Sequence, residues 1–334
     1  MPHAIGDLAM SLANRSSNLR IRSEINTLAQ ELSSGRKSDL GSALSGDLAP
    51  IALIERSLSN LSAYQTVTSE TALFLGAAQT ALGQISGHLE GLSGAAFDME
   101  NNANPALIDN FAKDAEGRFF SIASAMNAGI AGRSLFAGNA TDSKPLDRPE
   151  LVLSDLTAAI PPGADAKAVS DIVDAYFAPG AGFESNRYSG SNDAMAPLRV
   201  SADDNVAFGA TAKSDAMRAA LAATAKAALL DRGILAGDID EQRKLIRASG
   251  LDLMGAGAEI AALRADIGIA EAKVERAQVR NGAERSALDL ARADIVAADP
   301  FETASRLTAV QAQLETFYTV TARLSRLSLT EYLR

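Results

Sequence analysis

Residues 251–277 read LDLMGAGAEIAALRADIGIAEAKVERA, and this stretch has the most regular pattern of apolar residues in the chain. Its apolar side chains recur at alternating intervals of three and four residues, the spacing that places them along one face of an α-helix. This face consists of Leu253, Ala256, Ile260, Leu263, Ile267, Ala270, Val274 and Ala277, and further along in the same register Leu288, Ala291 and Ile295. So long a seam is typical of helices that pack side by side as coiled coils.

The same period occurs earlier in the chain, over residues 51–61 and 75–92. The residues that keep it are Ile51, Ile54, Leu58, Leu61, Leu75, Ala78, Leu82, Ile85, Leu89 and Leu92. Asn104 followed by Pro105 then predicts a helix start, because asparagine caps the first turn and proline suits its first position. The helix expected there carries Ile108, Phe111, Ala115, Phe119, Ile122 and Met126 on one face and ends near residue 129.

Both ends of the chain carry apolar stripes of the same kind, separated from the middle by breaks at residues 35–50 and 297–301. The N-terminal stripe, which we interpret as one face with an offset, contains Ile5, Leu8, Leu12, Leu19, Ile21, Ile25, Leu28 and Leu32. The C-terminal stripe contains Leu307, Val310, Leu314, Phe317, Val320, Leu324 and Leu327. Because an isolated amphipathic helix leaves its apolar face in water, we expect the two stripes to form an assembly seam, buried against each other or against other subunits.

Residues 137–215 differ in composition from the rest of the chain. They hold six of the ten prolines, and 12 acidic against 6 basic residues. Residues 151–160 and 166–177 predict short helices, whereas 187–191, 197–201 and 205–210 predict strands joined by turn-forming residues. We therefore expect a small, solvent-exposed α+β insert over residues 137–212, separate from the helices around it.

Charge and cysteine content exclude several classes of function. The formal net charge is −10 and no concentrated basic face is visible, which argues against nucleic-acid binding. Cysteine is absent, so disulfides, thiol catalysis and thiolate metal sites are excluded. Residues 1–15 contain an acid at Asp7 and no early cation, so we predict no cleaved signal peptide. Residues 71–89 are uncharged but carry several polar side chains, which favours a packed soluble helix over membrane insertion.

The residue patterns that could carry enzymatic chemistry are each better explained by structure. Gly132 and Gly138 lack the spacing and the following lysine of a phosphate-binding loop. The two histidines, His3 and His88, cannot form a recognisable metal pair or a catalytic triad. The acidic clusters at 203–205 and 238–241 lack the glycine and distal glutamate of a calcium loop, which favours turn and helix-cap roles. We predict no catalytic, cofactor-binding or metal-binding residue, no cofactor and no enzymatic activity.

A glycine recurs at every fourth position of the predicted helix at 75–92, at Gly83, Gly87 and Gly91. Each glycine weakens a helix by about 1 kcal/mol relative to alanine. Close packing against a neighbouring backbone would explain why three are tolerated, and a weak, flexible helix would explain them equally well. Both explanations stay open from the sequence.

Three short motifs resemble those of one protein family. Leu32, Ser33, Ser34, Gly35 and Arg36 resemble its L-S-S-G-[KR], and residues 132–138 resemble its G-R-x-[IL]-F-[AS]-G. The second match rests on Gly132, Arg133, Leu135, Phe136 and Gly138. The ending LSLTEYL at 327–333 resembles the L-S-L-x-x-Y-L of hook-filament junction proteins. Over its whole length the chain is thus similar to the bacterial flagellin superfamily, and within it to the hook-associated proteins of the hook-filament junction.

The resemblance implies a mainly α, elongated flagellin-like bundle of long coiled-coil helices from both chain ends, with a β-hairpin and a small α+β insert. Residues 1–34 and 301–334 would form a terminal coiled-coil inner layer, 35–136 and 213–300 a helical rod domain, and 137–212 the exposed insert. The segment 132–138 would be structural, leading from the rod toward the insert, with glycines for the turn and Leu135 and Phe136 as anchors.

The resemblance also implies a function and a location. The chain would be a structural subunit of the bacterial flagellum, a secreted, extracellular protein of motility that joins hook to filament by helical self-assembly. Its partners would be other copies of itself, hook-associated protein 1, flagellin, the flagellar export apparatus and an export chaperone, and export would need no cleaved signal. Filament flagellin is the nearest alternative, and a cytoplasmic coiled-coil scaffold is a more distant one.

Overall fold

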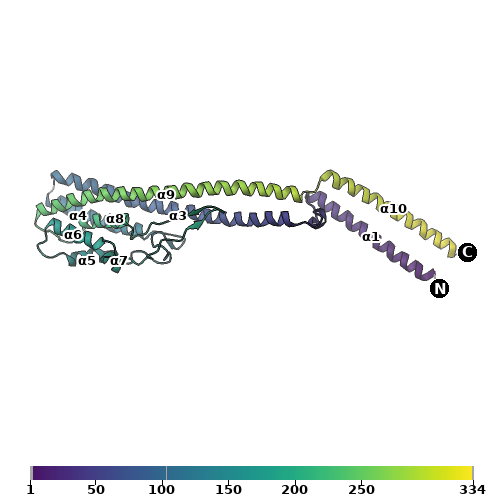
Figure 1. Ribbon diagram of the computed structural model, residues 1–334, viewed down its shortest axis with the longest axis horizontal. Coiled ribbons are helices and arrows are strands. Elements are labelled where there is room, and N and C mark those ends of the chain that lie inside the picture. The colour runs from purple at the N-terminus through teal and green to yellow at the C-terminus, as the bar shows by residue number, and fades with distance from the viewer. Residues whose placement is uncertain (1–2, 103, 333–334) are drawn as a thin grey trace. The chain divides into compact units, whose positions relative to one another are not determined.

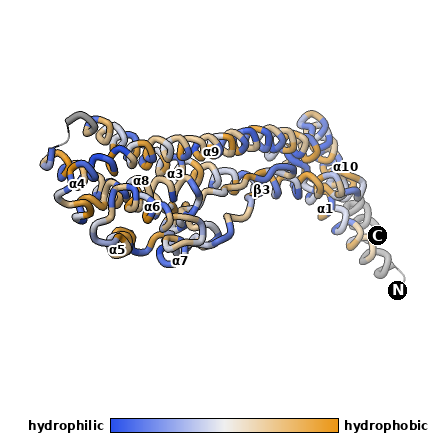
Figure 2. Tube along the Cα trace, turned by 60° about the vertical axis from the view of Figure 1, so that its left-hand side comes forward, coloured by the Kyte–Doolittle hydropathy of each residue, from blue (hydrophilic) through white to orange (hydrophobic). Residues whose placement is uncertain are grey.

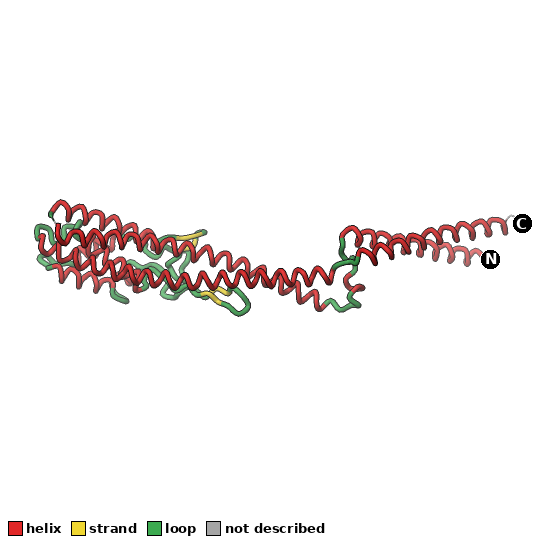
Figure 3. Tube along the Cα trace, turned by 90° about the horizontal axis from the view of Figure 1, so that it is seen from above, coloured by secondary structure: helices red, strands yellow, loops and turns green. Residues whose placement is uncertain are grey.

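The computed structural model describes residues 3–102 and 104–332, and the side chains of residues 9–99 and 104–323. These residues form ten α-helices and four short strands (Figure 1 and Figure 3). The elements are α1 (His3–Ser34), α2 (Leu40–Ala43), α3 (Ala49–Asn102), α4 (Pro105–Met126), β1 (Gly129–Ile130), β2 (Arg133–Ser134), α5 (Glu150–Ala159), α6 (Ala166–Phe177), α7 (Gly182–Asn186), β3 (Leu198–Arg199), β4 (Asn205–Val206), α8 (Asp215–Ala228), α9 (Ile239–Val296) and α10 (Pro300–Tyr332). The fold is mainly α-helical, as the sequence predicts.

The chain forms two compact units. Residues 1–61 and 283–334 make up the terminal unit, and residues 62–282 make up the central unit. Helices α3 and α9 contribute residues to both. The three-part division expected from the sequence, with 137–212 as a module of its own, stays a prediction.

The core of the central unit contains the two apolar seams that the sequence predicts for α3 and α9. Leu82, Ile85 and Ile260 are completely buried, and the rest of both seams between residues 75 and 277 is buried or partly buried. The two helices run antiparallel, since Gln79 Nε2 donates to Arg264 O (2.7 Å) and Ser93 Oγ donates to Gly250 O (3.2 Å). Figure 2 shows hydrophobic residues recurring along both helices.

Helix α8 also lies in this core, although the sequence shows no periodic pattern there. Residues 220–228 are all buried, so the helix has no solvent face over this stretch. A helix that is apolar on all sides is one that other helices surround. The alanine-rich run AALAATAKAA is therefore the sequence feature that could have predicted this buried helix, through its composition rather than its periodicity.

Two buried cations join α8 to neighbouring elements. Lys226 Nζ lies 2.8 Å from a carboxylate oxygen of Asp174 in α6 and 2.7 Å from Asp252 Oδ2 in α9, while the lysine side chain is only 2% exposed. Arg218 pairs in the same way with Glu184 in α7. A buried charge without a partner is strongly destabilising, so these pairs fix the positions of α6 and α7 on the core.

The insert shares the core of the central unit, whereas the sequence suggests a separate solvated module. Apolar side chains from all three of its helices are buried in one cluster with α3, α4, α8 and α9, namely Val152, Leu153, Leu156, Val169, Val173, Phe177 and Phe183. Only part of the expected strand content is present. Residues 197–201 and 205–210 supply the antiparallel pair β3–β4, but 187–191 supplies just one bridge, between Tyr188 and Leu146.

The three spaced glycines of α3 meet no neighbouring backbone within the chain. A Cβ atom at Gly83 or Gly91 would face the guanidinium of Arg264 or Arg118, and at Gly87 it would meet nothing within 4 Å. The close approach of α3 and α9 occurs instead at Gly250, where a Cβ atom would lie 3.0 Å from that of Ala96. Of the two explanations, close packing against a backbone of the same chain is therefore excluded for this stripe.

Candidate assembly surface

The terminal unit contains a hairpin of two long helices, α1 and α10, which lie side by side and antiparallel with both chain ends at the same end of the hairpin (Figure 1). A small apolar cluster holds the helices together. Ile21, Leu28 and Val310 are buried, and the side chains packed against them are Ile25, Leu307, Leu314 and Phe317. The structure thus brings together seven residues of the two predicted stripes.

Polar contacts flank the cluster on the side of the chain ends. Arg22 Nη2 donates to the hydroxyl oxygen of Tyr318 (3.0 Å). Hydrogen bonds from Asn18 and then Arg22 lower the pKa of the Tyr318 hydroxyl. Asn18 is partly buried at a position where an apolar seam would carry a leucine. The apolar seam between α1 and α10 therefore gives way to polar contacts toward the N-terminus of α1.

Helix α1 carries a second apolar face, which points away from α10. Leu12 and Leu19 belong to the predicted stripe, but they are 58% and 63% exposed. At about 100° per residue they lie nearly opposite Ile21 and Leu28 around the helix. The prediction of one stripe with an offset is therefore corrected: the offset between Leu19 and Ile21 separates two faces of α1, and α10 covers only one of them.

Further apolar residues of the terminal unit are exposed. Leu32 and Val320, both predicted seam residues, are 39% and 49% exposed, and Phe301 in the first turn of α10 is 86% exposed. The side chains of four other predicted seam residues lie outside the described residues, namely Ile5, Leu8, Leu324 and Leu327. Single exposed leucines are common on protein surfaces, whereas here Leu12, Leu19, Leu32, Val320 and Phe301 are all exposed on one pair of helices.

The two segments that interrupt the helices of the terminal unit, within residues 35–50 and 297–301, are hydrogen-bonded to each other. Helix α1 ends at Ser34, and Gly35 adopts a φ of +67°, the left-handed conformation typical of a helix C-terminus. Lys37 N then donates to Val296 O (2.9 Å), and Ala298 N donates to Gly35 O (3.0 Å). On the other side, Asp299 caps α10 by accepting from the amide of Phe301 (2.8 Å). The L-S-S-G-R motif therefore fixes where α1 ends beside the start of α10.

The second family motif lies at a crossing of backbone segments in the central unit. Residues 129–134 form the β1–β2 hairpin, with Gly132 in its turn. Leu135 and Phe136 follow it and are buried, and Phe136 O accepts from Ala212 N (2.9 Å). Gly138 has a φ of +62°, and a Cβ atom there would collide with Asp193 O. Only glycine fits this position, so the motif is built for backbone packing rather than for binding a ligand.

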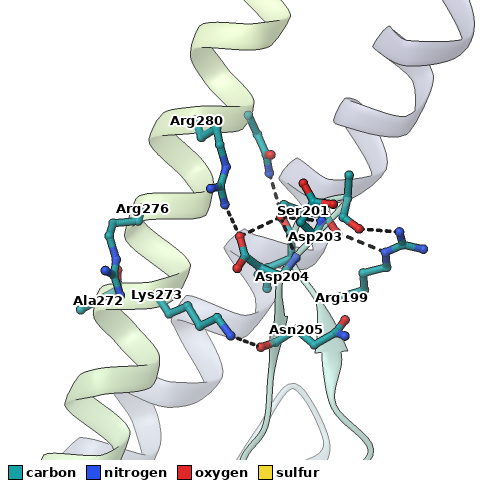
Figure 4. Close-up of polar contacts among 12 residues, drawn as sticks. Arg199, Ser201, Asp203, Asp204, Asn205, Ala272, Lys273, Arg276 and Arg280 are labelled. Carbon is teal, nitrogen blue, oxygen red and sulfur yellow. Dashed lines mark hydrogen bonds and ion pairs between the residues drawn. The ribbon is translucent and has the colours of Figure 1, made fainter.

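The acidic clusters considered from the sequence are occupied by protein partners. Asp204 accepts from Ser201 Oγ (3.0 Å) within the β3–β4 turn and pairs with Arg280 of α9, and Lys273 Nζ donates to Asn205 O (2.7 Å), as Figure 4 shows. Asp238 accepts from the amide of Glu241 (3.1 Å) at the start of α9. These are the turn and cap roles that the sequence favours. Among the described residues, no group of three potential ligands is arranged to hold a metal ion.

The two units differ in charge. The terminal unit has 13 acidic and 12 basic residues, and the central unit has the other 28 acidic and 19 basic residues. Almost all of the net negative charge therefore belongs to the central unit.

As regards membranes, none of the described helices combines the length and the apolar character that a crossing would need.

Comparisons with known proteins agree with this architecture. The family described as the bacterial flagellin C-terminal helical region matches residues 253–333, which cover most of α9 and all of the described part of α10. A structure described as that of a flagellar hook-associated protein from Vibrio parahaemolyticus matches with a TM-score of 0.52 at 15% sequence identity, over 74% of this chain and 97% of that chain.

At that identity the likeness to the Vibrio protein is one of fold. No curated protein matches the sequence significantly. Proteins of the flagellin family are structural and are not enzymes, which agrees with the absence of a predicted catalytic site. The C-terminal part of this chain, in α9 and α10, is thus similar to the flagellin C-terminal helical region, and the chain shares the fold of a flagellar hook-associated protein.

Proposed function

We propose that this chain is the subunit that joins the flagellar hook to the filament, and that it assembles helically with other copies of itself through its terminal helices. The observation that carries the proposal is the second apolar face of α1. Leu12 and Leu19 are more than half exposed and lie opposite the face that α10 covers. A helix with two apolar faces buries both only when it is covered from two sides.

Burial of this second face would supply a useful part of the assembly energy. A fully buried leucine gains roughly 1.5–3 kcal/mol relative to an exposed one. Leu12 and Leu19 would together gain about 3–6 kcal/mol per copy on that scale. The near-neutral charge of the terminal unit means that like-charge repulsion does not oppose this contact, whereas the acidic central unit keeps its own surface soluble.

The junction role and the partners rest on the resemblance of residues 327–333 to junction proteins and on the shared fold with a hook-associated protein. In this role the chain contacts hook-associated protein 1 on the hook side and flagellin on the filament side. It leaves the cell through the flagellar export apparatus, with an export chaperone and without a cleaved signal. Its final location is the extracellular part of the flagellum.

A deletion strain tests the junction role. We expect cells without this chain to secrete flagellin that stays unattached, because the filament has no base on which to grow. Immunogold labelling of wild-type flagella should mark a single position between hook and filament. Label along the whole filament would favour the alternative of filament flagellin, and motile cells with normal filaments after deletion would exclude the junction role.

A further inference from the structure

Within the central unit, the apolar seam of α9 ends on a polar residue. Asn281 follows Ala277 at the seam interval of four residues, and it is only 6% exposed. A polar group in such a position is costly unless it is hydrogen-bonded. The side-chain Nδ2 atom of Asn281 donates to Val200 O (2.9 Å), directly after β3. A single buried asparagine in a helix seam can set the alignment of the partner to which it bonds.

The part of α3 that runs beside this end of α9 also has few apolar seam residues. The seam positions before Leu75 hold Thr71, Thr68 and Tyr64, at the same intervals of three and four residues. Thr68 and Thr71 are buried, but their hydroxyl groups donate to carbonyl oxygens of α3 itself, at 2.9 and 2.7 Å. Apolar contact between the two helices is therefore weaker here than over residues 75–92, so this end of the pair depends on other contacts.

The segment that supplies these contacts contains β3, β4 and the turn between them, residues 198–206, which we call the β3–β4 strap. Lys273 and Arg280 of α9 bond to its polar groups, as Figure 4 shows. On the side of α3, the guanidinium of Arg199 lies 6.0 Å from the ring centre of Tyr64, a cation–π contact. The strap is therefore attached to both helices at the place where their seam is polar.

The β3–β4 strap also covers apolar side chains of the core. Val200 is completely buried and Val206 is 3% exposed. Phe208, two residues after the strap, packs edge to face on Phe74 of α3, with ring centres 5.1 Å apart. A two-stranded hairpin is at most marginally stable alone in water. The strap therefore keeps its shape only while it is held on the helices, and its release would expose this part of the core.

Of these polar contacts between the strap and α9, the hydrogen bond from Asn281 is the buried one. The side chains of Arg280 and Asp204 are 58% and 26% exposed, and exposed ion pairs contribute little to stability because water and salt screen them. The bond from Lys273 is also exposed to water. Loss of the Asn281 donor, in contrast, leaves Val200 O unpaired where water cannot replace the donor.

We propose that Asn281 is a positioning residue that locks the β3–β4 strap over the end of the α3–α9 core. Without its hydrogen bond the strap opens locally, while the rest of the central unit stays folded. The inference concerns the folded monomer, so it does not depend on the proposed role at the junction of hook and filament.

Hydrogen exchange in the monomer tests this lock. The amides of Val200 and Ser201, which both donate to Asp204 O within the strap, report its opening. In Asn281→Leu they should exchange about tenfold faster than in the wild type, because a buried carbonyl loses its donor. The amides of α3 and α8 should keep their wild-type rates.

Two further variants serve as controls. Ser249→Ala removes another buried side-chain donor of α9, whose partner is Ala223 O in α8 (2.8 Å), and it should leave exchange in the strap unchanged. Asp204→Asn removes the charge of the exposed ion pair, and it should accelerate exchange in the strap by less than about threefold.

Three results would overturn the inference. Unchanged exchange of the strap in Asn281→Leu would show that the bond is not needed, and equal acceleration throughout the central unit would show that Asn281 only supports the fold as a whole. An acceleration by Asp204→Asn as large as that by Asn281→Leu would assign the lock to the ion pair. If Asn281→Leu does not fold, Asn281→Ala, which adds no bulk, takes its place with the same expectations.

Discussion

At the scale of single residues, the β1–β2 turn shows how backbone geometry and sequence can disagree. Ala131 and Gly132, the two residues of the turn, have φ values of +49° and +78°. Positive φ at both positions defines the hairpin turn that prefers Asn-Gly. Glycine satisfies that preference at the second position, but alanine at the first is held in a conformation that costs roughly 1–2 kcal/mol.

We therefore expect Ala131→Asn to stabilise the protein. Asparagine tolerates positive φ better than alanine does, so the free energy of unfolding should rise by up to about 1 kcal/mol. Chemical denaturation of the monomer measures it. Gly132→Ala is the matched control and should lower the same quantity, and a loss of stability in the asparagine variant would contradict the assigned turn.

His88 in α3 gives the protein a pH dependence of predictable sign. Burial, and then the nearby Arg118, hold the pKa of His88 below its ordinary value of 6.5, against a smaller opposing effect of Asp114. The unfolded chain therefore binds the proton more readily than the folded chain. The free energy of unfolding falls as the pH drops from the pKa of His88 in the unfolded chain to its lower pKa in the folded chain. Denaturation curves give the free energy of unfolding at about pH 5 and at about pH 8, and the difference between these two values should be smaller for His88→Gln than for the wild type. An unchanged difference would contradict this assignment.

At the scale of elements, the long helices were predictable because their signal is local and repeated. The buried seams of α3 and α9 follow from intervals of three and four residues alone. The sequence could not show which apolar face of α1 meets α10, because Leu19 and Ile21 are equally apolar and only the partner helix distinguishes them. The buried pairs of Lys226 were also beyond prediction, since Asp174 and Asp252 come close to it only in the folded chain.

The contact between α3 and α9 predicts opposite behaviour for two glycines of α9. At Gly255 nothing lies within 4 Å of an added Cβ atom, so Gly255→Ala should stabilise the helix by about 1 kcal/mol. At Gly250 the added atom would lie 3.0 Å from the Ala96 Cβ atom, so Gly250→Ala should lose that gain through crowding. Thermal unfolding of the two variants measures the difference. Equal stabilisation by both would mean that the helices are not in close contact at Gly250.

The two faces of α1 predict different effects of the same substitution. Leu28 is 3% exposed and Leu19 is 63% exposed, so Leu28→Glu buries a charge in the hairpin and Leu19→Glu does not. Hydrogen exchange in the monomer should become faster in α1 and α10 for the Leu28 variant and stay unchanged for the Leu19 variant. Faster exchange in both would show that Leu19 faces α10 after all.

At the scale of the whole molecule, net charge and apolar core are distributed unequally between the two units. The central unit holds a large core and most of the net charge, whereas the terminal unit is nearly neutral and has a small core. The motif at residues 132–138 pointed to the family, but the sequence could not show that the insert would share the core. That result depends on packing between α5, α6 and α8, which no local pattern records.

The most direct measurement concerns the uncovered face of α1. A strain without the gene would be supplied with the double variant L12E/L19E, and the amount of this chain in sheared flagella would be compared with that in the culture medium. We predict that the variant is secreted but not incorporated, and that filaments are lost, although the monomer folds as the wild type does. Incorporation at the wild-type level would contradict the claim that this face joins one copy to the next.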